Sequence, residues 1–428
     1  MKVLVIGSGG REHSLVEKIF NSSLVDKVFC APGNAGTDEC GTNVPIPAND
    51  IKGLVAFAKK EKIDLTVVGP EDPLVHGIVD EFQKNGLKIF GPNKKAAQLE
   101  GSKIFTKRLL EKYGIPTAKY QKSYSLYPAT KCIMQHDYPL VIKADGLAAG
   151  KGVYICNNFE DAFKALYELM IEKKFGDAGT EIIIEDFLKG EEASCIYFVD
   201  YNGNILPLAS SQDHKAVGDG DTGPNTGGMG AYSPAPVITK ELEKRIMEEI
   251  IRPTVKAMAT EGCPYTGVLY AGLMIDSAGN PKVLEYNARM GDPETQPLMM
   301  RMNSDLVPIL LTALDGKLDE CKVDWTPYVA LCVVMAAKGY PGSYEKGFRI
   351  DELFNAGKDA HIHQAGTTLD GHSHTVSSGG RVLNVTALSK TYLGAQQKAY
   401  KAIEKINSDG KLFCRNDIGY RAINREAA

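Results

Sequence analysis

The sequence lacks a long apolar run, a strong net charge and closely spaced cysteines, and each absence narrows the range of functions. Apolar stretches such as residues 329–337 are far shorter than the ~20 residues that a membrane span needs. A net charge of −4 provides no general basic field, so we expect neither a membrane nor a nucleic-acid partner. The N-terminus passes directly into an expected strand, and we expect no signal peptide.

The nine cysteines are scattered along the chain and form no C-x-x-C motif. This pattern is typical of reduced thiols and predicts a cytoplasmic protein without a disulfide framework or a zinc–cysteine site. The chain also shows no internal repeat and no low-complexity tract, which excludes solenoids and disordered tails.

Two pairs of alternating histidines lie near the C-terminus, His361 with His363 and His372 with His374. On strands, each pair would share one face, as metal ligands do. Because no carboxylate or thiol evidently accompanies them, we expect two exposed strand or turn segments with a structural role.

With 428 residues the chain is too long for one hydrophobic core, and its fold class is predicted to be α/β. In residues 1–103, short apolar runs that end in Gly or Pro alternate with segments of helical spacing. This alternation predicts a doubly wound domain with a parallel sheet, whose ligands bind beyond the carboxyl ends of the strands.

The remainder divides into two further parts. Residues 104–325 contain a smaller α/β lobe at about 120–190 and a larger lobe at about 192–325, which includes one long helix near 238–262. Residues 326–428 form short strands and turns closed by a helix at 390–407, and we expect a small α+β domain there.

The stretch "VIKADGLAAGKGV" at residues 141–153 predicts a phosphate-binding loop. Glycines allow backbone N–H groups to surround phosphate oxygens, and Lys143 and Lys151 would neutralise their charge, with Gly150 and Gly152 beside them. The stretch is one residue short of a Walker A loop and lacks its Ser or Thr.

Two further segments carry candidate chemistry on strands. In "IIIEDFLKGEEAS", the extended segment that contains Glu185 and Leu188 can offer main-chain N–H and C=O groups to the edge of a purine. Glu192 lies far enough along the chain to accept hydrogen bonds from ribose hydroxyls. In "PKVLEYNARMGDPETQP", Glu285 and Asn287 share one strand face opposite Leu284 and Tyr286, which predicts a magnesium site. Arg289 would share that face if the strand continued.

Residues 210–234 form a glycine-rich stretch that is too long for a routine connector, and we expect a functional loop. Asp213, His214 and Lys215 stand at its start. The turn "GSGG" at residues 7–10 opens a helix and can hold a phosphate, but Glu12 stands where a dinucleotide fingerprint requires Gly or Ala.

The order of Lys103, Lys143, the glycine loop, Glu185, Leu188, Glu192, Glu285 and Asn287 resembles the ATP-grasp superfamily. Within it, the chain resembles the phosphoribosylamine–glycine ligase family from residue 1 to near 425. The motifs that carry this resemblance are "GGREH", "APGNAG", "VGPE", "FGP", "LEGSK", "IKADGLAAGKGV", "SQDHK", "DTGPNTGGMGAYSP", "GDPETQP" and "GGRVL".

The resemblance implies a pre-ATP-grasp N-terminal domain, a two-lobed ATP-grasp core, and ligation of glycine to 5-phosphoribosylamine in the second step of purine synthesis. ATP is the implied co-substrate and Mg²⁺ or Mn²⁺ the implied metal; relatives are often monomeric. The implied residues are Lys103, Lys143, Gly150, Lys151, Gly152, Glu185, Leu188 and Glu192 for ATP, Glu285 and Asn287 for metal, Asp213, Lys215 and Arg289 for catalysis, and Gly7, Gly9, Gly10, Glu71, Asp213, Lys215, Arg289, Gly291 and Asp292 for substrate.

The chain departs from the family at two positions. Gly272 stands where many ATP-grasp enzymes carry a third metal-binding carboxylate, and Gln364 replaces a common histidine. Three alternative functions remain open: another ATP-grasp ligase or a biotin-dependent carboxylase, an NAD-linked oxidoreductase, and a nucleotide-binding regulator without catalysis.

Overall fold

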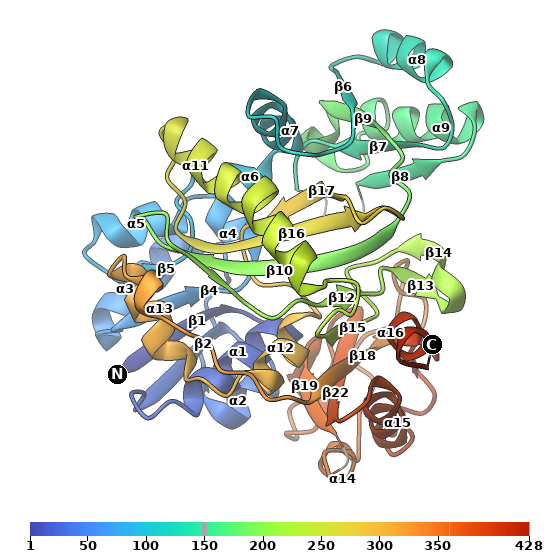
Figure 1. Cartoon of the computed structure of the whole chain (residues 1–428). Coiled ribbons are helices and arrows are strands. Elements are labelled where there is room, and N and C mark those ends of the chain that lie inside the picture. Colours follow the sequence, from blue (N-terminus) through green and yellow to red (C-terminus); the bar gives the residue numbers. More distant parts are fainter. Residues whose placement is uncertain (148–151, 359, 428) are drawn as a thin grey trace.

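The N-terminal part of the molecule is a five-stranded parallel sheet in the order β3-β2-β1-β4-β5 (Figure 1). The computed structural model describes residues 1–147, 152–358 and 360–427. The elements of this first part are β1 (Lys2–Gly7), α1 (Gly10–Phe20), β2 (Lys27–Pro32), α2 (Thr37–Cys40), β3 (Thr42–Asn43), α3 (Ile51–Glu61), β4 (Leu65–Val68), α4 (Glu71–Val75), α5 (Ile78–Lys84) and β5 (Ile89–Phe90).

Side chains of β1 alternate between two hydrophobic clusters. Val3 and Val5 pack in the same cluster as residues of α1, whereas Leu4 and Ile6 pack with residues of α3 and α5 on the other face. A strand buried on both faces is expected in a parallel sheet covered by helices on each side. The predicted doubly wound arrangement is therefore confirmed.

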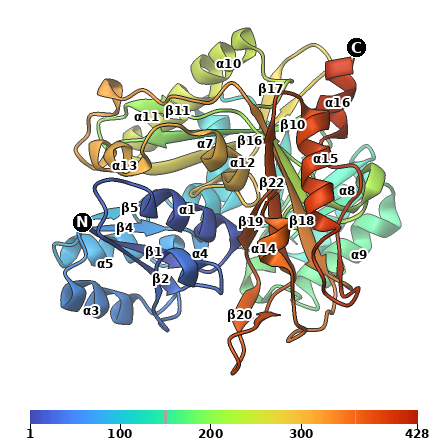
Figure 2. The ribbon, with the colours of Figure 1, turned by 90° about the horizontal axis from the view of Figure 1, so that it is seen from below.

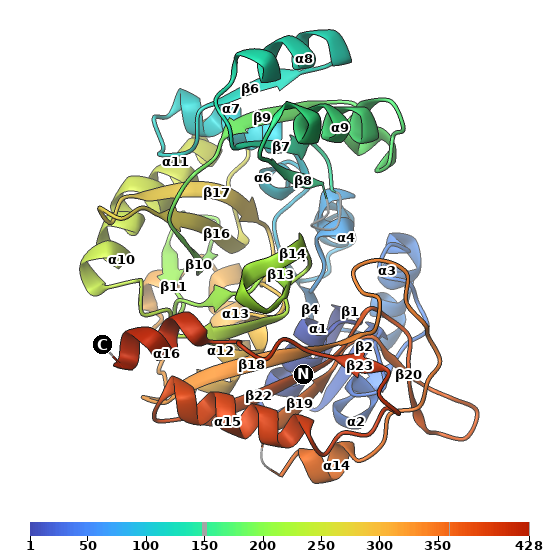
Figure 3. The ribbon, with the colours of Figure 1, turned by 90° about the vertical axis from the view of Figure 1, so that its right-hand side faces the viewer.

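A small lobe with its own core projects from the rest of the molecule (Figures 1 and 3). Two helices, α6 (Gln98–Gly101) and α7 (Lys103–Lys112), precede it. Its four strands form an antiparallel sheet in the order β6-β9-β7-β8. Its elements are β6 (Tyr120–Ser123), α8 (Leu126–Gln135), β7 (Leu140–Ala144), β8 (Val153–Cys156), α9 (Phe159–Met170), the 3₁₀ turn η1 (Gly176–Gly179) and β9 (Ile182–Asp186).

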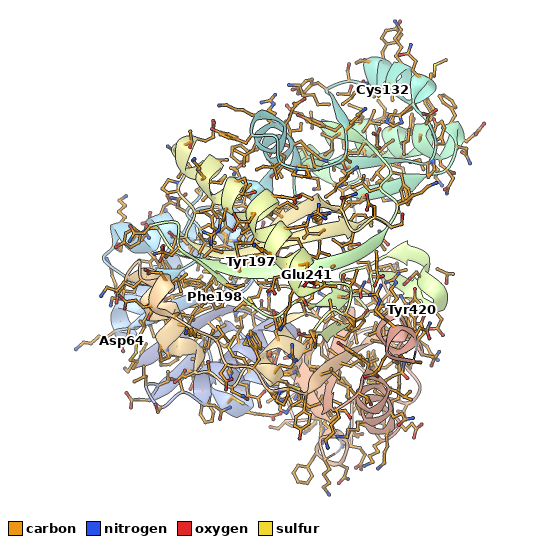
Figure 4. All side chains as sticks on the ribbon, viewed as in Figure 1. Asp64, Cys132, Tyr197, Phe198, Glu241 and Tyr420 are labelled. Atoms are coloured by element: carbon orange, nitrogen blue, oxygen red, sulfur yellow. The ribbon has the colours of Figure 1, made fainter. Side chains whose placement is uncertain are left out.

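The larger lobe is built on a second antiparallel sheet, in the order β11-β10-β16-β17. Successive residues of β10, Tyr197 and Phe198 (Figure 4), enter different hydrophobic clusters. The ring of Phe198 lies edge-on to that of Phe90 of β5, with centroids 5.5 Å apart. The sheet thus packs against the N-terminal part. Its elements are β10 (Glu191–Val199), β11 (Ile205–Pro207), β16 (Gly267–Ile275), β17 (Pro281–Asn287), α12 (Thr295–Arg301), α13 (Leu306–Leu314) and the 3₁₀ turn η4 (Leu318–Glu320).

The long helix expected near residues 238–262 is interrupted. It consists of α10 (Lys240–Ile246), the π-helical turn η3 (Met247–Ile251) and α11 (Arg252–Thr260). Pro253 lies in the first turn of α11 and has no N–H to donate to the preceding turn, which accounts for the break in the α-helical hydrogen bonding.

The C-terminal sheet has the order β12-β15-β18-β22-β19, and β23 also pairs with β18. Figure 2 shows β19, β22 and β18 beside the N-terminal part. The elements are β12 (Gln212–Asp213), β15 (Gly230–Ser233), β18 (Val329–Ala337), α14 (Leu353–Ala356), β19 (His361–Gln364), β20 (Thr367–Leu369), β21 (Thr375–Ser377), β22 (Arg381–Ser389), α15 (Tyr392–Ile403), β23 (Leu412–Phe413) and α16 (Tyr420–Ala427).

The glycine-rich segment 210–234 is more ordered than the loop that we expected. Besides β12 and β15, it contains a hairpin of β13 (Ala216–Gly218) and β14 (Thr222–Asn225), joined by the 3₁₀ turn η2 (Asp219–Asp221). Because β12 and β15 join strands from beyond residue 325, this segment connects the larger lobe to the C-terminal sheet. Such long-range pairing leaves no trace in local sequence. Within the described ranges, no helix combines the length and apolar character that crossing a membrane requires.

Candidate active site

A cavity of about 420 Å³ lies where the small lobe, the larger lobe, the N-terminal sheet and the C-terminal sheet meet. Thirteen of the residues proposed from sequence line it. They are Glu71, Lys103, Lys143, Gly152, Glu185, Leu188, Glu192, Asp213, Lys215, Glu285, Asn287, Arg289 and Asp292. Gly7, Gly9, Gly10 and Gly291 do not line it, and Gly150 and Lys151 lie outside the described residues.

Lysines from two elements converge on one carboxylate at the small-lobe side of the cavity. Lys143, on β7, and Lys107, on α7, place their Nζ atoms 3.1 and 3.3 Å from Glu185 Oε2. Burial lowers the pKa of Lys107 to about 8 despite the neighbouring Glu185. Lys107 was missed in the sequence, although it lies one turn after Lys103 on the same helix face.

The position of Lys103 is set by the first turn of α7. Ser102 caps this helix by accepting from the backbone N–H of Phe105 at 3.1 Å. Asp145, just after β7, accepts from Ser102 Oγ at 3.0 Å and from the N–H of Ile104 at 2.7 Å. Lys103 Nζ donates to Gly146 O at 3.2 Å, and burial lowers the pKa of this lysine. These contacts tie the helix to the start of the predicted phosphate loop.

Lys215 lies among three carboxylates on the larger-lobe side. Its Nζ forms an ion pair with Glu192 and lies 3.3 Å from Glu285 Oε1. Burial opposes a charged lysine here, but Glu192, Glu285 and Asp213 outweigh it and raise the pKa of Lys215 well above its usual value. Lys215 in turn is the main cause that lowers the pKa of Glu285 to about 2. Burial instead raises the pKa of Asp213.

Strand β17 carries a bulge that alters the predicted alternation. Glu285 pairs with Gly272 and Val283 with Leu273, so Leu284 has no partner in this register. Leu284 therefore lines the cavity together with Glu285, and its carbonyl accepts from Lys143 Nζ at 3.1 Å. The expectation that Leu284 faces away from Glu285 is wrong. Lys143 and Glu285 nevertheless line the same cavity.

Arg289 lies beyond the end of β17 rather than on it, and two glutamates hold its guanidinium. Its Nε lies 3.1 Å from Glu71, and an Nη lies 3.0 Å from Glu100. Burial favours a higher pKa for Glu71, but Arg289 and Arg11 lower it to about 2. For Glu100 burial dominates and raises the pKa to about 7. Glu100 belongs to "LEGSK", a motif in which the sequence analysis gave a role to Lys103 but not to Glu100.

In the glycine turn before α1, a side chain of that helix accepts a backbone hydrogen bond from the turn. The N–H of Gly9 donates to Glu12 Oε2 at 2.5 Å, and Arg11 Nε donates to the other carboxylate oxygen at 2.5 Å. Glu12 is buried over Gly7, where an added Cβ would lie 2.4 Å from its Cγ. A dinucleotide-binding turn requires its helix and strand to pack closely, and here the Glu12 side chain takes up the space between α1 and β1. Arg11, from the same turn, does line the cavity.

The C-terminal sheet contributes Arg381, which the sequence analysis did not select. Its guanidinium contacts Asp292 Oδ2 at 2.9 Å and donates to the carbonyls of Asp292 and Gly227 at 2.7 and 2.6 Å. Tyr270 and Glu294 also line the cavity, and the tyrosine donates to the glutamate at 2.5 Å. Arg381 belongs to "GGRVL", one of the motifs that carry the family resemblance, but the sequence alone does not show that this arginine reaches the cavity.

The first histidine pair differs from the expectation of an exposed segment. His363 is 2% exposed and His361 is half-buried, and both face the carboxylate of Glu17. The carboxylate was not anticipated because Glu17 is more than three hundred residues away in sequence. The second pair is consistent with the prediction: His372 is exposed, and His374 lies beside Asp370 in a turn.

The donor set on β17 fits a hard divalent cation. Glu285 offers a carboxylate and Asn287 an amide oxygen to the same cavity. Mg²⁺ prefers such oxygen ligands and commonly uses one or two protein carboxylates together with substrate phosphates.

Comparison with known proteins shows matches along almost the whole chain. Models of phosphoribosylglycinamide synthetase match in three parts: the N domain at residues 1–100, the ATP-grasp (A) domain at 101–295 and the C domain at 330–421. A phosphoribosylamine–glycine ligase from Salmonella typhi is 57% identical over 429 residues, with all of both chains covered. One from Vibrio cholerae is 54% identical over 433 residues, again with full coverage of both.

Solved structures extend the comparison. The crystal structure of a phosphoribosylamine–glycine ligase from Thermotoga maritima matches with a TM-score of 0.82 and 34% identity, covering 98% of this chain and all of that one. A biotin carboxylase domain from Hydrogenobacter thermophilus, crystallised with MgADP, matches with a TM-score of 0.73 over 95% of this chain and 90% of that one. Its identity is 15%, so this second likeness concerns the fold alone.

Proposed function

Since the chain belongs to the phosphoribosylamine–glycine ligase family and has that ligase activity in purine biosynthesis, we propose that it works through a glycyl phosphate intermediate. A carboxylate oxygen of glycine attacks the γ-phosphorus of ATP, the bond to the β-phosphate breaks, and ADP leaves. The amine of 5-phosphoribosylamine then attacks the glycyl carbonyl carbon, phosphate leaves, and the nitrogen loses a proton. The observation that supports this proposal is a single cavity with clustered lysines on one side and a carboxylate–amide pair on the other.

For the phosphates of the nucleotide, we assign Lys103 and Lys143 to the α- and β-phosphates. Both lysines line the cavity, and Lys103 Nζ contacts the first glycine of the predicted phosphate loop. Gly150, Lys151 and Gly152 would close over the γ-phosphate, where backbone N–H groups and a lysine can neutralise its charge.

For the adenosine part of the nucleotide, we assign Glu185, Leu188 and Glu192. Glu185 and Leu188 would border the adenine, and Glu192 would receive the ribose hydroxyls; all three line the cavity. Glu185 also orders the ammonium groups of Lys143 and Lys107 at this side of the cavity. The adenine would therefore lie next to the phosphate-binding lysines.

For the metal, we assign Glu285 and Asn287 as the protein ligands of Mg²⁺ or Mn²⁺. Both offer oxygen atoms to the cavity, which fits a hard divalent cation. When bound, such an ion would neutralise charge on the phosphates of ATP. Lys215, 3.3 Å from Glu285 Oε1, would move from this carboxylate toward substrate.

For glycine and the transferred phosphoryl group, we assign Asp213, Lys215 and Arg289. Asp213 would receive the amino group of glycine, and Lys215 its carboxylate. Arg289, which Glu71 and Glu100 hold in place, would stabilise the negative charge of the transferring group. Phosphoryl transfer of this kind depends mainly on positioning and charge neutralisation.

For the phosphoribosyl group, we assign the glycine turn Gly7, Gly9 and Gly10 together with Glu71, Gly291 and Asp292. Arg11 belongs to that turn and lines the cavity, so it is added to this set. Because Glu12 takes the N–H of Gly9, binding of the 5-phosphate there requires Glu12 to give up this hydrogen bond.

We further propose a monomer that acts in the cytoplasm without a nucleic-acid or membrane partner. The proposed domain limits are residues 1–103, 104–325 and 326–428, with the smaller lobe at about 120–190. All nine cysteines are free, which is compatible with a reducing compartment.

Isotope transfer tests the intermediate. Glycine labelled with ¹⁸O in its carboxylate should pass one labelled oxygen to the released phosphate when ATP and 5-phosphoribosylamine are present. ADP release without glycine serves as the control and should be slow. Unlabelled phosphate would contradict the glycyl phosphate route.

A further inference from the structure

A second group of chemically active side chains lies outside the cavity, between α1 and β19. His361 Nε2 lies 2.6 Å and His363 Nε2 lies 3.3 Å from Glu17 Oε2. One ligand atom from each of the three residues lies within 4.8 Å of the other two. None of the three lines the cavity of the candidate active site.

The local structure explains why the three meet. His361 and His363 are two residues apart on β19, so both side chains leave the same face of the strand. Helix α1 packs beside β19 (Figure 2), and Glu17 lies on the side of the helix that faces it. The two imidazole rings are in contact, with centroids 4.5 Å apart. Each ring directs its Nε2 atom at the same oxygen, Oε2 of Glu17.

We propose that Glu17, His361 and His363 bind a divalent transition-metal ion, best represented by Zn²⁺. Zinc binds imidazole nitrogen and carboxylate oxygen at about 2.0–2.2 Å, which places tetrahedral ligand atoms about 3.3 Å apart. The 3.3 Å separation of His363 Nε2 from Glu17 Oε2 matches that spacing, whereas the 2.6 Å separation of His361 Nε2 is that of a hydrogen bond and must lengthen when the ion enters. Two histidines and one glutamate leave the fourth position for water.

The burial of His363 supports the same site. Its side chain is 2% exposed, and its Nδ1 is buried without a hydrogen-bond partner in the described structure. Nε2, the atom directed at Glu17, is thus the ring nitrogen of His363 that has a polar partner in the described structure. On its far side, His13 lies edge-on to His363 with centroids 5.5 Å apart, and His13 Nδ1 already accepts from the N–H of Gln364.

The bound ion would join the N-terminal sheet to the C-terminal sheet. Glu17 comes from the first of these parts and the two histidines from the second, so the ion would act as a cross-link between them. A ligand that binds only the folded state stabilises it by mass action, so Zn²⁺ should raise the melting temperature.

The test uses the full chain stripped of metal with EDTA, without nucleotide. Zn²⁺ is titrated by calorimetry, and Co²⁺ is added as a spectroscopic probe of nitrogen ligands. We expect one equivalent to bind, and we expect Glu17→Gln and His361→Asn each to weaken binding at least about tenfold. His372→Asn, in the second histidine pair, is the matched control and should bind as the parent does.

Both test variants should keep ligase activity with Mg²⁺ and ATP within about twofold, which shows that they fold. The proposal is overturned if the parent chain binds no Zn²⁺ or Co²⁺. It is equally overturned if Glu17→Gln and His361→Asn bind as tightly as the parent, or if the Co²⁺ spectrum lacks nitrogen ligation.

Discussion

At the scale of single residues, charge compensation dominates the candidate site. Lys215 contacts Glu192 and Glu285, and both carboxylates together with Asp213 raise its pKa. Removing one partner of such a cluster leaves the others uncompensated, which costs more than the pair contributes when intact. The side chain therefore matters for the geometry of the cavity as well as for the chemistry assigned to it.

We expect Lys215→Met to lower kcat/KM at least about 100-fold, because the three carboxylates then repel one another and the anionic substrates. ADP release with all three substrates measures this loss. Lys112→Met is the matched control: Lys112 pairs with Glu261 on the surface, and the variant should remain within about twofold of the parent. Equal activity of both variants would contradict the role of Lys215.

The two glutamates beside Arg289 should respond to pH in opposite ways. The pKa of Glu100 is raised to about 7, so between about pH 4.5 and 7 the folded state keeps a proton that the unfolded chain has released. This group makes the free energy of unfolding fall as pH rises through that window. The pKa of Glu71 is lowered to about 2, so its contribution is complete above about pH 4.5 and is lost only in acid.

We therefore expect Glu100→Gln to gain stability relative to the parent between pH 5 and 8, by up to about 3 kcal/mol. Over the same range the difference between Glu71→Gln and the parent should stay constant, which makes this variant the control. Denaturant unfolding at several pH values measures both. A constant difference for Glu100→Gln would show that burial does not keep this carboxyl protonated.

At the scale of elements, the first turn of α7 contacts Asp145 and Gly146, at the start of the predicted phosphate loop. Asp145 follows β7 and accepts hydrogen bonds from Ser102 and from the N–H of Ile104, so one carboxylate fixes both the helix start and the strand end. Lys103 begins the same helix. A change at Asp145 should thus move Lys103 and Lys143, the two lysines that we assign to the ATP phosphates, relative to each other.

We expect Asp145→Ala to raise the KM for ATP about tenfold and to lower stability by about 1–2 kcal/mol. Asn158→Ala removes a comparable cap, the hydrogen bond from the N–H of Asp161 at the start of α9, away from the cavity lining. It should cost similar stability and leave the KM for ATP unchanged. Steady-state kinetics with varied ATP separate the two outcomes.

The sequence predicted most strands and helices because their apolar periodicity is local. Val3 to Ile6 of β1 and the run at residues 329–337 are buried as expected. Three features depend on distant partners and were not predicted: the pairing of β12 and β15 with the C-terminal sheet, the bulge at Leu284, and Glu17 beside His361. The same reason explains why Glu100 and Arg381 were missed as cavity residues, whereas Lys107 had a local signal in its helical spacing from Lys103.

At the scale of the whole molecule, the cavity is completed by a residue from the far end of the chain. Arg381 of β22 contacts Asp292 and the carbonyl of Gly227, so the C-terminal sheet, the segment after β17 and the segment before β15 meet at one guanidinium. The planar fork of arginine makes these contacts together, whereas lysine offers a single point charge.

Because Arg381 contacts Asp292, we assign it to the phosphoribosyl side of the cavity, outside the small lobe. We expect Arg381→Lys to lower kcat/KM for 5-phosphoribosylamine about 10- to 100-fold with little change in the KM for ATP. Arg349→Lys, in the same C-terminal part, changes an exposed pair with Asp351 and should leave both values unaltered. An equal rise in the KM for ATP in Arg381→Lys would contradict this assignment.

The small lobe begins with β6 and ends with β9, and these two strands pair with each other from Tyr120 opposite Glu185 to Ser123 opposite Ile182. The small lobe therefore leaves and rejoins the rest of the chain at two neighbouring, hydrogen-bonded strands. Another lobe with the same strand spacing could replace it without longer connections to the rest of the molecule. The part of the proposed ATP site that this lobe supplies, with Lys143 and Glu185, can therefore diversify in evolution or be replaced by design, while the residues assigned to ATP and metal on α7, β10 and β17 stay in place.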